Sequence, residues 1–101
     1  NCYLAESFFD RVIGLMGRSS LPSGYGMWLE PCNSIHTFFM RFQIDVLYLS
    51  KQAQNQYLIL KIRRHVKPWR IDKPVFQASA VLELSAGTSN ELKEGDCLCL
   101  S

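Results

Sequence analysis

Residues 44–66, IDVLYLSKQAQNQYLILKIRRHV, decide the fold of this chain. Residues 44–49 are rich in strand-forming side chains, and alternate positions share one face of an extended chain. Residues 51–56 are polar and predict a hairpin loop. Residues 57–66 predict a long strand with an apolar face of Leu58, Leu60, Ile62 and Val66 and a polar face of Lys61, Arg63 and His65. This alternation indicates an antiparallel sheet with one buried side and one solvent-exposed side.

The flanking sequence continues this pattern in both directions. Strand-like segments are predicted over residues 2–5, 26–29, 35–42, 76–84 and 96–100. Capping-box signatures predict a helix from Ser7 to about Gly17 and a one-turn helix from Thr88 to Gly95. Short connections favour antiparallel pairing. We therefore expect an α+β, mainly β fold, a small antiparallel curled sheet or barrel with one flanking helix and a short second helix.

Length and composition limit the class of protein. The chain has 101 residues, which predicts a single β-rich domain over residues 1–101. Apolar residues make up 48% and charged residues 20%, values that exclude a disordered or fibrous chain. The formal net charge of +2 is too small to name a polyanionic partner. No apolar run reaches the roughly 18–20 residues that span a bilayer, so we expect no membrane span.

The cysteines bear on the cellular compartment. Cys2, Cys32, Cys97 and Cys99 form no Cys-x-x-Cys pair, and a domain of this size does not depend on disulfides. We interpret them as small, buried side chains in a reducing environment. The expected location is therefore cytoplasmic, with the alternative that the protein is exported and its signal peptide already removed.

Cys32, His36 and Met40 are candidate ligands of a soft metal, because thiolate, imidazole and thioether are copper ligands. Their order resembles the copper loop of cupredoxins over nine residues. Cupredoxins add a histidine upstream, and no histidine precedes His36 here. On a strand, His36 and Met40 would also lie about 13 Å apart, too far to share one ion. We favour a core methionine with a hydrogen-bonded histidine and expect no cofactor, keeping copper as an alternative.

His36 and Asp45 form a second candidate pair across the bend near residues 42–43. A carboxylate beside an imidazole fixes its tautomer and raises its basicity, as a general base requires. The sequence contains no nucleophile motif and no phosphate-binding glycine loop. The pair therefore fits a binding pocket or a structural ion pair, with hydrolysis as the enzymatic alternative.

Residues 61–73 contain six of the eleven basic residues and include Trp69. Arginines around a tryptophan can contact phosphates while the ring stacks on a base. The nine acidic residues of the chain offset these cations and leave no wider basic face, so we expect no nucleic-acid partner. A basic strand edge that prevents aggregation explains the same residues.

The whole chain resembles a bacterial and archaeal family called domain of unknown function 192. The resemblance rests on motifs spread along the sequence: Arg11-x-x-Gly-Leu-Met16 with Arg18, Gly26-Met27, His36-Thr-Phe-Phe-Met40, Ile44-Asp-Val-Leu47, Lys67-Pro-Trp-Arg70, Val81-Leu-Glu-Leu-Ser-Ala-Gly87 and Gly95-Asp96. Two positions depart from the family pattern, Phe39 in place of tryptophan and Gln43 in place of proline. The resemblance implies a small β-rich barrel with a flanking helix, and it implies no activity.

The polar motif positions supply the expected binding site. They are Arg11, Arg18, His36, Met40, Asp45 and Glu83. We expect a noncatalytic binding domain whose pocket lies between the first helix and the sheet, around His36 and Asp45, and takes a small or peptide-like ligand. The alternatives are a hydrolytic enzyme using His36 and Asp45, and copper binding through Cys32, His36 and Met40. Exposed strand edges also allow a homodimer.

Overall fold

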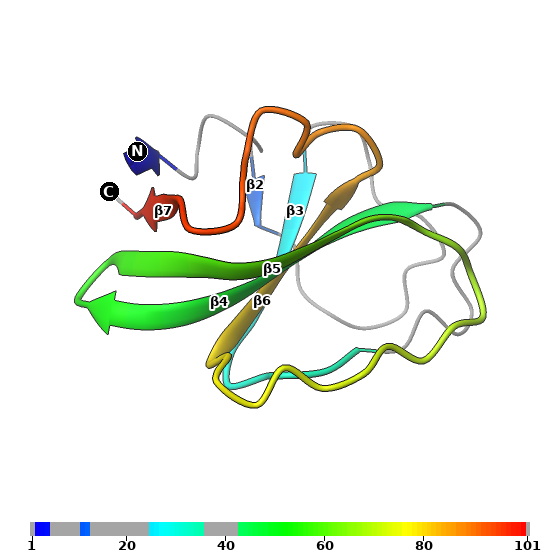
Figure 1. Cartoon of the computed structure of the whole chain (residues 1–101). Coiled ribbons are helices and arrows are strands. Elements are labelled where there is room, and N and C mark those ends of the chain that lie inside the picture. Colours follow the sequence, from blue (N-terminus) through cyan, green and yellow to red (C-terminus); the bar gives the residue numbers. More distant parts are fainter. Residues whose placement is uncertain (1, 5–10, 13–24, 36–42, 101) are drawn as a thin grey trace.

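The computed structural model describes residues 2–4, 11–12, 25–35 and 43–100, and these residues form one curled sheet (Figure 1). Its strands are β1 (Cys2–Leu4), β2 (Arg11–Val12), β3 (Tyr25–Leu29), β4 (Ile44–Ala53), β5 (Gln56–Val66), β6 (Ala80–Ser85) and β7 (Cys97–Cys99). They lie in the order β1-β7-β5-β4-β6-β3-β2. The inner five strands pair antiparallel, and the short edge strands β1 and β2 pair parallel with β7 and β3. The expected curled antiparallel sheet is thus confirmed.

The hairpin of β4 and β5 forms the long arm of the sheet (Figure 1). The predicted loop over residues 51–56 is shorter than expected, because β4 continues to Ala53 and β5 begins at Gln56. Asn55 takes a φ of 62° in the intervening turn, and asparagine tolerates this left-handed conformation better than most residues.

Apolar side chains cover both faces of the sheet, so the expectation of one solvent-exposed side is wrong. We call the two sets the first core and the second core. The first core contains Leu47, Leu49, Tyr57, Ile59, Ile62, Ala80, Leu82, Leu84, Leu92 and Leu98. The second core contains Ile35, Ile44, Val46, Tyr48 and Val81. The pairing shifts by one residue between Tyr48–Lys61 and Leu49–Ile59, which changes the buried set on β5 from the one that simple alternation predicts.

The α+β prediction is also wrong, because the described residues contain no helix and the fold is all-β. Within the segment predicted as the first helix, Arg11 and Val12 form strand β2 beside β3, and the rest of that segment lies outside the described residues. The second predicted helix consists of turns. Its backbone bonds join residues three apart, as in Asn90 N–H to Gly87 O and Leu92 N–H to Ser89 O.

Tertiary contacts explain why the second capping box does not start a helix. The Ser89 hydroxyl donates to Asp45 Oδ2 at 2.6 Å, so this side chain bonds to strand β4 and not to its own segment. Arg64 donates to the carbonyls of Ser89 and Leu92, at 3.1 and 2.6 Å. Within the segment, Lys93 N–H donates to Asp96 Oδ2 at 3.0 Å. These partners stabilise the turns more than a helix of one turn could stabilise itself.

The remaining predicted strands differ from the observed strands mainly at their ends. The strand expected over residues 76–84 begins only at Ala80, and the strand expected over residues 96–100 is Cys97–Cys99. The strand expected over residues 35–42 lies outside the described residues beyond Ile35. In the part of the chain that the structure describes, no helix is long and apolar enough to cross a membrane.

Residues 67–79, which we call the strap, connect β5 to β6 and run beside residues 32–35 (Figure 1). Three backbone bonds join the strap to these residues: Asp72 N–H to Ile35 O at 3.1 Å, Val75 N–H to Asn33 O at 2.8 Å, and Cys32 N–H to Ser79 O at 3.2 Å. A fourth, from Ser79 N–H to Leu49 O at 2.8 Å, joins the end of the strap to β4. Val75 and Ala78 of the strap pack against the second core. The strap therefore covers the face that the alternation had assigned to solvent.

Candidate functional site

The structure describes two of the six expected site side chains, Asp45 and Glu83. Arg18, His36 and Met40 lie outside the described residues. Arg11 belongs to β2, where its backbone pairs with Tyr25, and its side chain lies outside the described part. The expected contact between His36 and Asp45 therefore stays a prediction.

Asp45 is fully buried and accepts four hydrogen bonds. Its Oδ1 accepts from His65 N–H at 3.1 Å. Its Oδ2 accepts from the N–H groups of Gly87 and Ser89, both at 3.1 Å, and from the Ser89 hydroxyl at 2.6 Å. A buried carboxylate needs several donors of this kind to compensate for lost hydration.

The partners of Asp45 hold two irregular segments in place. His65 has a φ of 56° near the end of β5, and Gly87 has a φ of 91° in the turn after β6. Such conformations are costly for non-glycine residues and persist where surrounding contacts fix them. Asp45, on β4 between these strands, ties both segments to the centre of the sheet. Its described contacts are thus those of a structural group.

Glu83 is also buried, with 6% of its surface exposed. Burial raises the pKa of its carboxyl group from 4.5 to about 7. No described residue donates a hydrogen bond or an ion pair to it. Between about pH 4.5 and 7 the folded chain therefore holds a proton that the unfolded chain releases, and the free energy of unfolding falls as pH rises across this window.

The strand register shows which neighbours Glu83 has. It pairs with Val46 on β4 and with Met27 on β3, and Val46 pairs in turn with Arg63 on β5. Residues opposite one another across strands share a face of the sheet. Glu83 therefore lies on the face of the second core, next to Val46 and Met27.

Asp45 and Glu83 lie on opposite faces of the sheet. Asp45 pairs with Leu84, whose side chain belongs to the first core, whereas Glu83 pairs with Val46 of the second core. Adjacent residues on a strand point to opposite faces. The sheet does not bring these two acids into one pocket.

A polar network fixes the strap over the face of the sheet that carries the second core. The Tyr48 hydroxyl donates to Asp72 Oδ2 at 2.6 Å, and Arg63 Nε lies 2.6 Å from the same oxygen. The Arg63 contact is an ion pair whose N–H is not aligned as a hydrogen bond. The Arg63 guanidinium also lies 5.9 Å from the centre of the Tyr48 ring. Burial and the adjacent Asp72 raise the pKa of the Tyr48 phenol well above its ordinary value, so Tyr48 acts as a hydrogen-bond donor.

Sequence reasoning missed this network. Asp72 is the one acid among residues 57–82, within the segment that holds most of the basic residues. That isolated acid was the available signal, because a single carboxylate among many cations is expected to pair with one of them.

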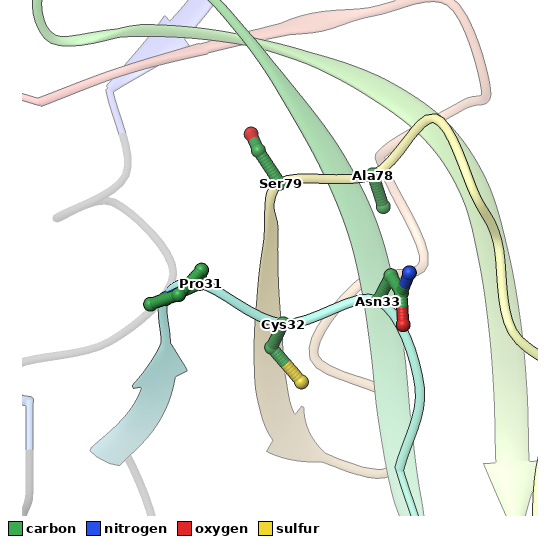
Figure 2. A pocket seen from close by; sticks show the side chains of 5 residues that line it. All are labelled: Pro31, Cys32, Asn33, Ala78 and Ser79. Atoms are coloured by element: carbon green, nitrogen blue, oxygen red, sulfur yellow. The ribbon is translucent and has the colours of Figure 1, made fainter.

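A pocket of about 250 Å³ lies where the strap meets the segment after β3. Pro31, Cys32, Asn33, Ala78 and Ser79 line it (Figure 2). The Cys32 thiol donates to Ser34 O at 3.0 Å. Among the described residues, no three histidine, cysteine or acidic side chains are grouped as metal ligands. His36 and Met40, the other expected copper ligands, lie outside that part of the chain.

These features define a small all-β protein, a curled antiparallel half-barrel with a buried acid on each face of its sheet. The chain belongs to the family domain of unknown function 192, described as "Uncharacterized ACR, COG1430", whose model matches residues 1–100. The resemblance seen in the sequence motifs is thus confirmed.

Two individual proteins are similar to this chain. The chain is 30% identical over 95 residues to the UPF0127 protein PH1112 of Pyrococcus horikoshii. This match covers 89% of the chain and 76% of that protein. A crystal structure of a protein of unknown function from Novosphingobium aromaticivorans matches with a TM-score of 0.60 and 20% identity, over 93% of this chain and 70% of that chain. The second likeness concerns the fold alone.

Proposed function

We propose that this chain is a noncatalytic binding domain whose site is centred on Glu83, on the face of the sheet that carries the second core. The ligand is a small or peptide-like molecule that presents an amine or another N–H donor. The single observation that supports this proposal is a buried carboxyl group without a donor among the described residues, whose pKa is raised to about 7 by burial. Strongly perturbed acids of this kind are concentrated at functional sites.

The contrast between the two acids favours Glu83 as the residue that meets the ligand. All four described hydrogen bonds of Asp45 come from within the chain, so its burial needs no ligand. Glu83 when ionised carries a desolvation cost that no described donor offsets. A ligand that places an N–H group on this carboxylate offsets that cost, which gives the site a preference for donors.

The other expected site residues complete the proposal. Other motifs of the same family supply Arg11, Arg18, His36 and Met40. We propose that these residues line the pocket together with Glu83. The arginines suit a carboxylate on the ligand, so amino acids and dipeptides carry both required groups. Hydrolysis through His36 and Asp45, and copper binding through Cys32, His36 and Met40, stay as sequence predictions without a described contact that favours them.

The test is a binding screen on the intact chain. Amines, amino acids and dipeptides are added to ¹⁵N-labelled protein, and amide shifts are followed at Met27, Val46 and Glu83. The expected result is a set of ligands that shift these amides, with affinity reduced about tenfold or more in Glu83→Gln, as for a lost hydrogen bond to a charged group.

A matched control separates binding from folding. Glu94→Gln changes an exposed glutamate that accepts a hydrogen bond from Ile62 N–H at 3.1 Å, and it leaves ligand affinity unchanged. Equal affinity in Glu83→Gln and the unsubstituted protein, or no ligand that shifts the three amides, would overturn the proposal.

A further inference from the structure

The strap has an inner and an outer side with different chemistry. On the inner side, Asp72 accepts from Tyr48 and pairs with Arg63, both at 2.6 Å. Val75 packs on the second core, and its N–H donates to Asn33 O at 2.8 Å. Asp72 is the only acid in residues 67–79, and it is turned inward and neutralised. The strap therefore presents no acid on its outer side.

The outer side combines cations with large apolar side chains. Trp69, Ile71 and Phe76 are 58, 75 and 80% exposed, and they are the exposed large hydrophobic residues of the described part of the chain. The basic residues between and beside them are also exposed: Lys67, Arg70 and Lys73. These six exposed residues lie within residues 67–76, and no other described segment exposes a large apolar side chain.

The backbone at Trp69 supports a functional reading of this surface. Trp69 has a φ of 62°, a left-handed conformation that bulky side chains rarely adopt. Such conformations persist where the surrounding structure fixes them, and they are concentrated at binding sites and switch regions.

We infer that the outer side of the strap docks on the surface of an anionic lipid bilayer. Lysine and arginine are attracted by anionic headgroups. Tryptophan favours the interface, with its ring among the lipids and its N–H near water. Ile71 and Phe76 supply aliphatic and aromatic groups that enter the boundary of the acyl chains. The chain lies on the membrane in this arrangement and does not cross it.

A lipid surface fits the strap better than other anionic partners. The apolar residues are spread over eight positions of irregular chain with cations between them. A fluid headgroup layer accepts such a line without a complementary groove. A single-stranded nucleic acid would use Trp69 and the cations, but Ile71, an aliphatic side chain 75% exposed, contributes nothing to base stacking.

Co-sedimentation with lipid vesicles tests this inference on the intact chain. We expect binding to vesicles that mix phosphatidylglycerol with phosphatidylcholine, little binding to phosphatidylcholine alone, and weaker binding at high salt. The double change Ile71→Ser with Phe76→Ser lowers the partition coefficient more than tenfold, as expected for losing two inserted side chains. Lys73→Gln lowers it roughly fivefold. These residues are exposed, so the urea midpoints of the variants stay close to that of the unsubstituted protein.

Matched changes elsewhere distinguish the strap from general charge. Lys93→Gln removes an exposed lysine outside the strap, and Gln77→Ser changes an exposed polar residue within it. Both leave the partition coefficient unchanged if the inference is correct. It is overturned by the absence of vesicle binding, by an equal loss in Lys93→Gln, or by tighter binding to a single-stranded oligonucleotide or an acidic peptide than to the vesicles. The result does not depend on Glu83, so the two proposals fail separately.

Discussion

Replacing Asp45 with alanine should remove about half of the stability of this protein. The substitution leaves the N–H groups of His65, Gly87 and Ser89 and the Ser89 hydroxyl without their acceptor. An unsatisfied buried donor costs about 1–3 kcal/mol, so four donors with partial access of water lead to a loss of about 4–6 kcal/mol. A domain of this length has a total stability of about 5–15 kcal/mol.

The asparagine variant refines the estimate. Asp45→Asn keeps the shape and one acceptor oxygen but turns an NH2 group toward N–H donors, which costs about 2–3 kcal/mol. Glu94→Gln provides the control, because Glu94 is exposed and accepts only the Ile62 N–H among the described residues, and its loss should stay below about 1 kcal/mol.

Urea unfolding followed by circular dichroism measures all three values, with an unchanged m-value as the sign that the same surface is exposed on unfolding. A loss below about 1 kcal/mol in Asp45→Ala would refute the reasoning. Asp45 would then be free to take the ligand role that the sequence had suggested for it.

Three other changes have expected outcomes. Glu83→Gln should raise the free energy of unfolding by about 3 kcal/mol near pH 8 and leave it unchanged near pH 4. The reason is that the pKa of the carboxyl group rises from 4.5 to about 7 on folding, so its ionisation destabilises the folded state. Equal effects at both pH values would count against this. Asp72→Asn should cost about 1–3 kcal/mol and speed hydrogen exchange at the Val75 amide, and unchanged exchange would show that Asp72 does not hold the strap. Asn55→Ala should cost about 1 kcal/mol in thermal unfolding because φ is 62° there, while Asn55→Gly is close to neutral; the reverse order would contradict the turn.

The strands could be predicted where local pattern and tertiary packing agree. The runs around Ile44 and Tyr57 are β-rich over their whole length and correspond to β4 and β5. The faces of β5 could not be predicted, because the one-residue shift beside Leu49 depends on how the partner strand packs. A pattern read from one strand contains no information about such a shift.

The prediction of a second helix was wrong for a related reason. Thr88 to Glu91 has the local signal of a helix start, but the Ser89 hydroxyl bonds to Asp45, 44 residues earlier in the sequence. Arg64 donates hydrogen bonds to two carbonyls of the same segment. Long-range partners override a weak local preference, and a single sequence does not reveal them.

The candidate site was predictable in part. The motif positions included Asp45 and Glu83, two of the three buried acids of the described residues. Alternation on β5 assigned the face of Lys61, Arg63 and His65 to solvent, whereas the strap covers the second core on that side of the sheet. The strap has no periodic pattern, so its position over the sheet could not be read from the order of its residues.

A ¹³C NMR titration of the Glu83 side-chain carboxyl tests the central claim most directly, because it measures the proton affinity of the group on which the proposed site depends. The account predicts a midpoint near pH 7 in the ligand-free protein, raised by burial. A midpoint near 4.5, the ordinary value, would contradict it, since the carboxyl would then be hydrated or already satisfied by the chain.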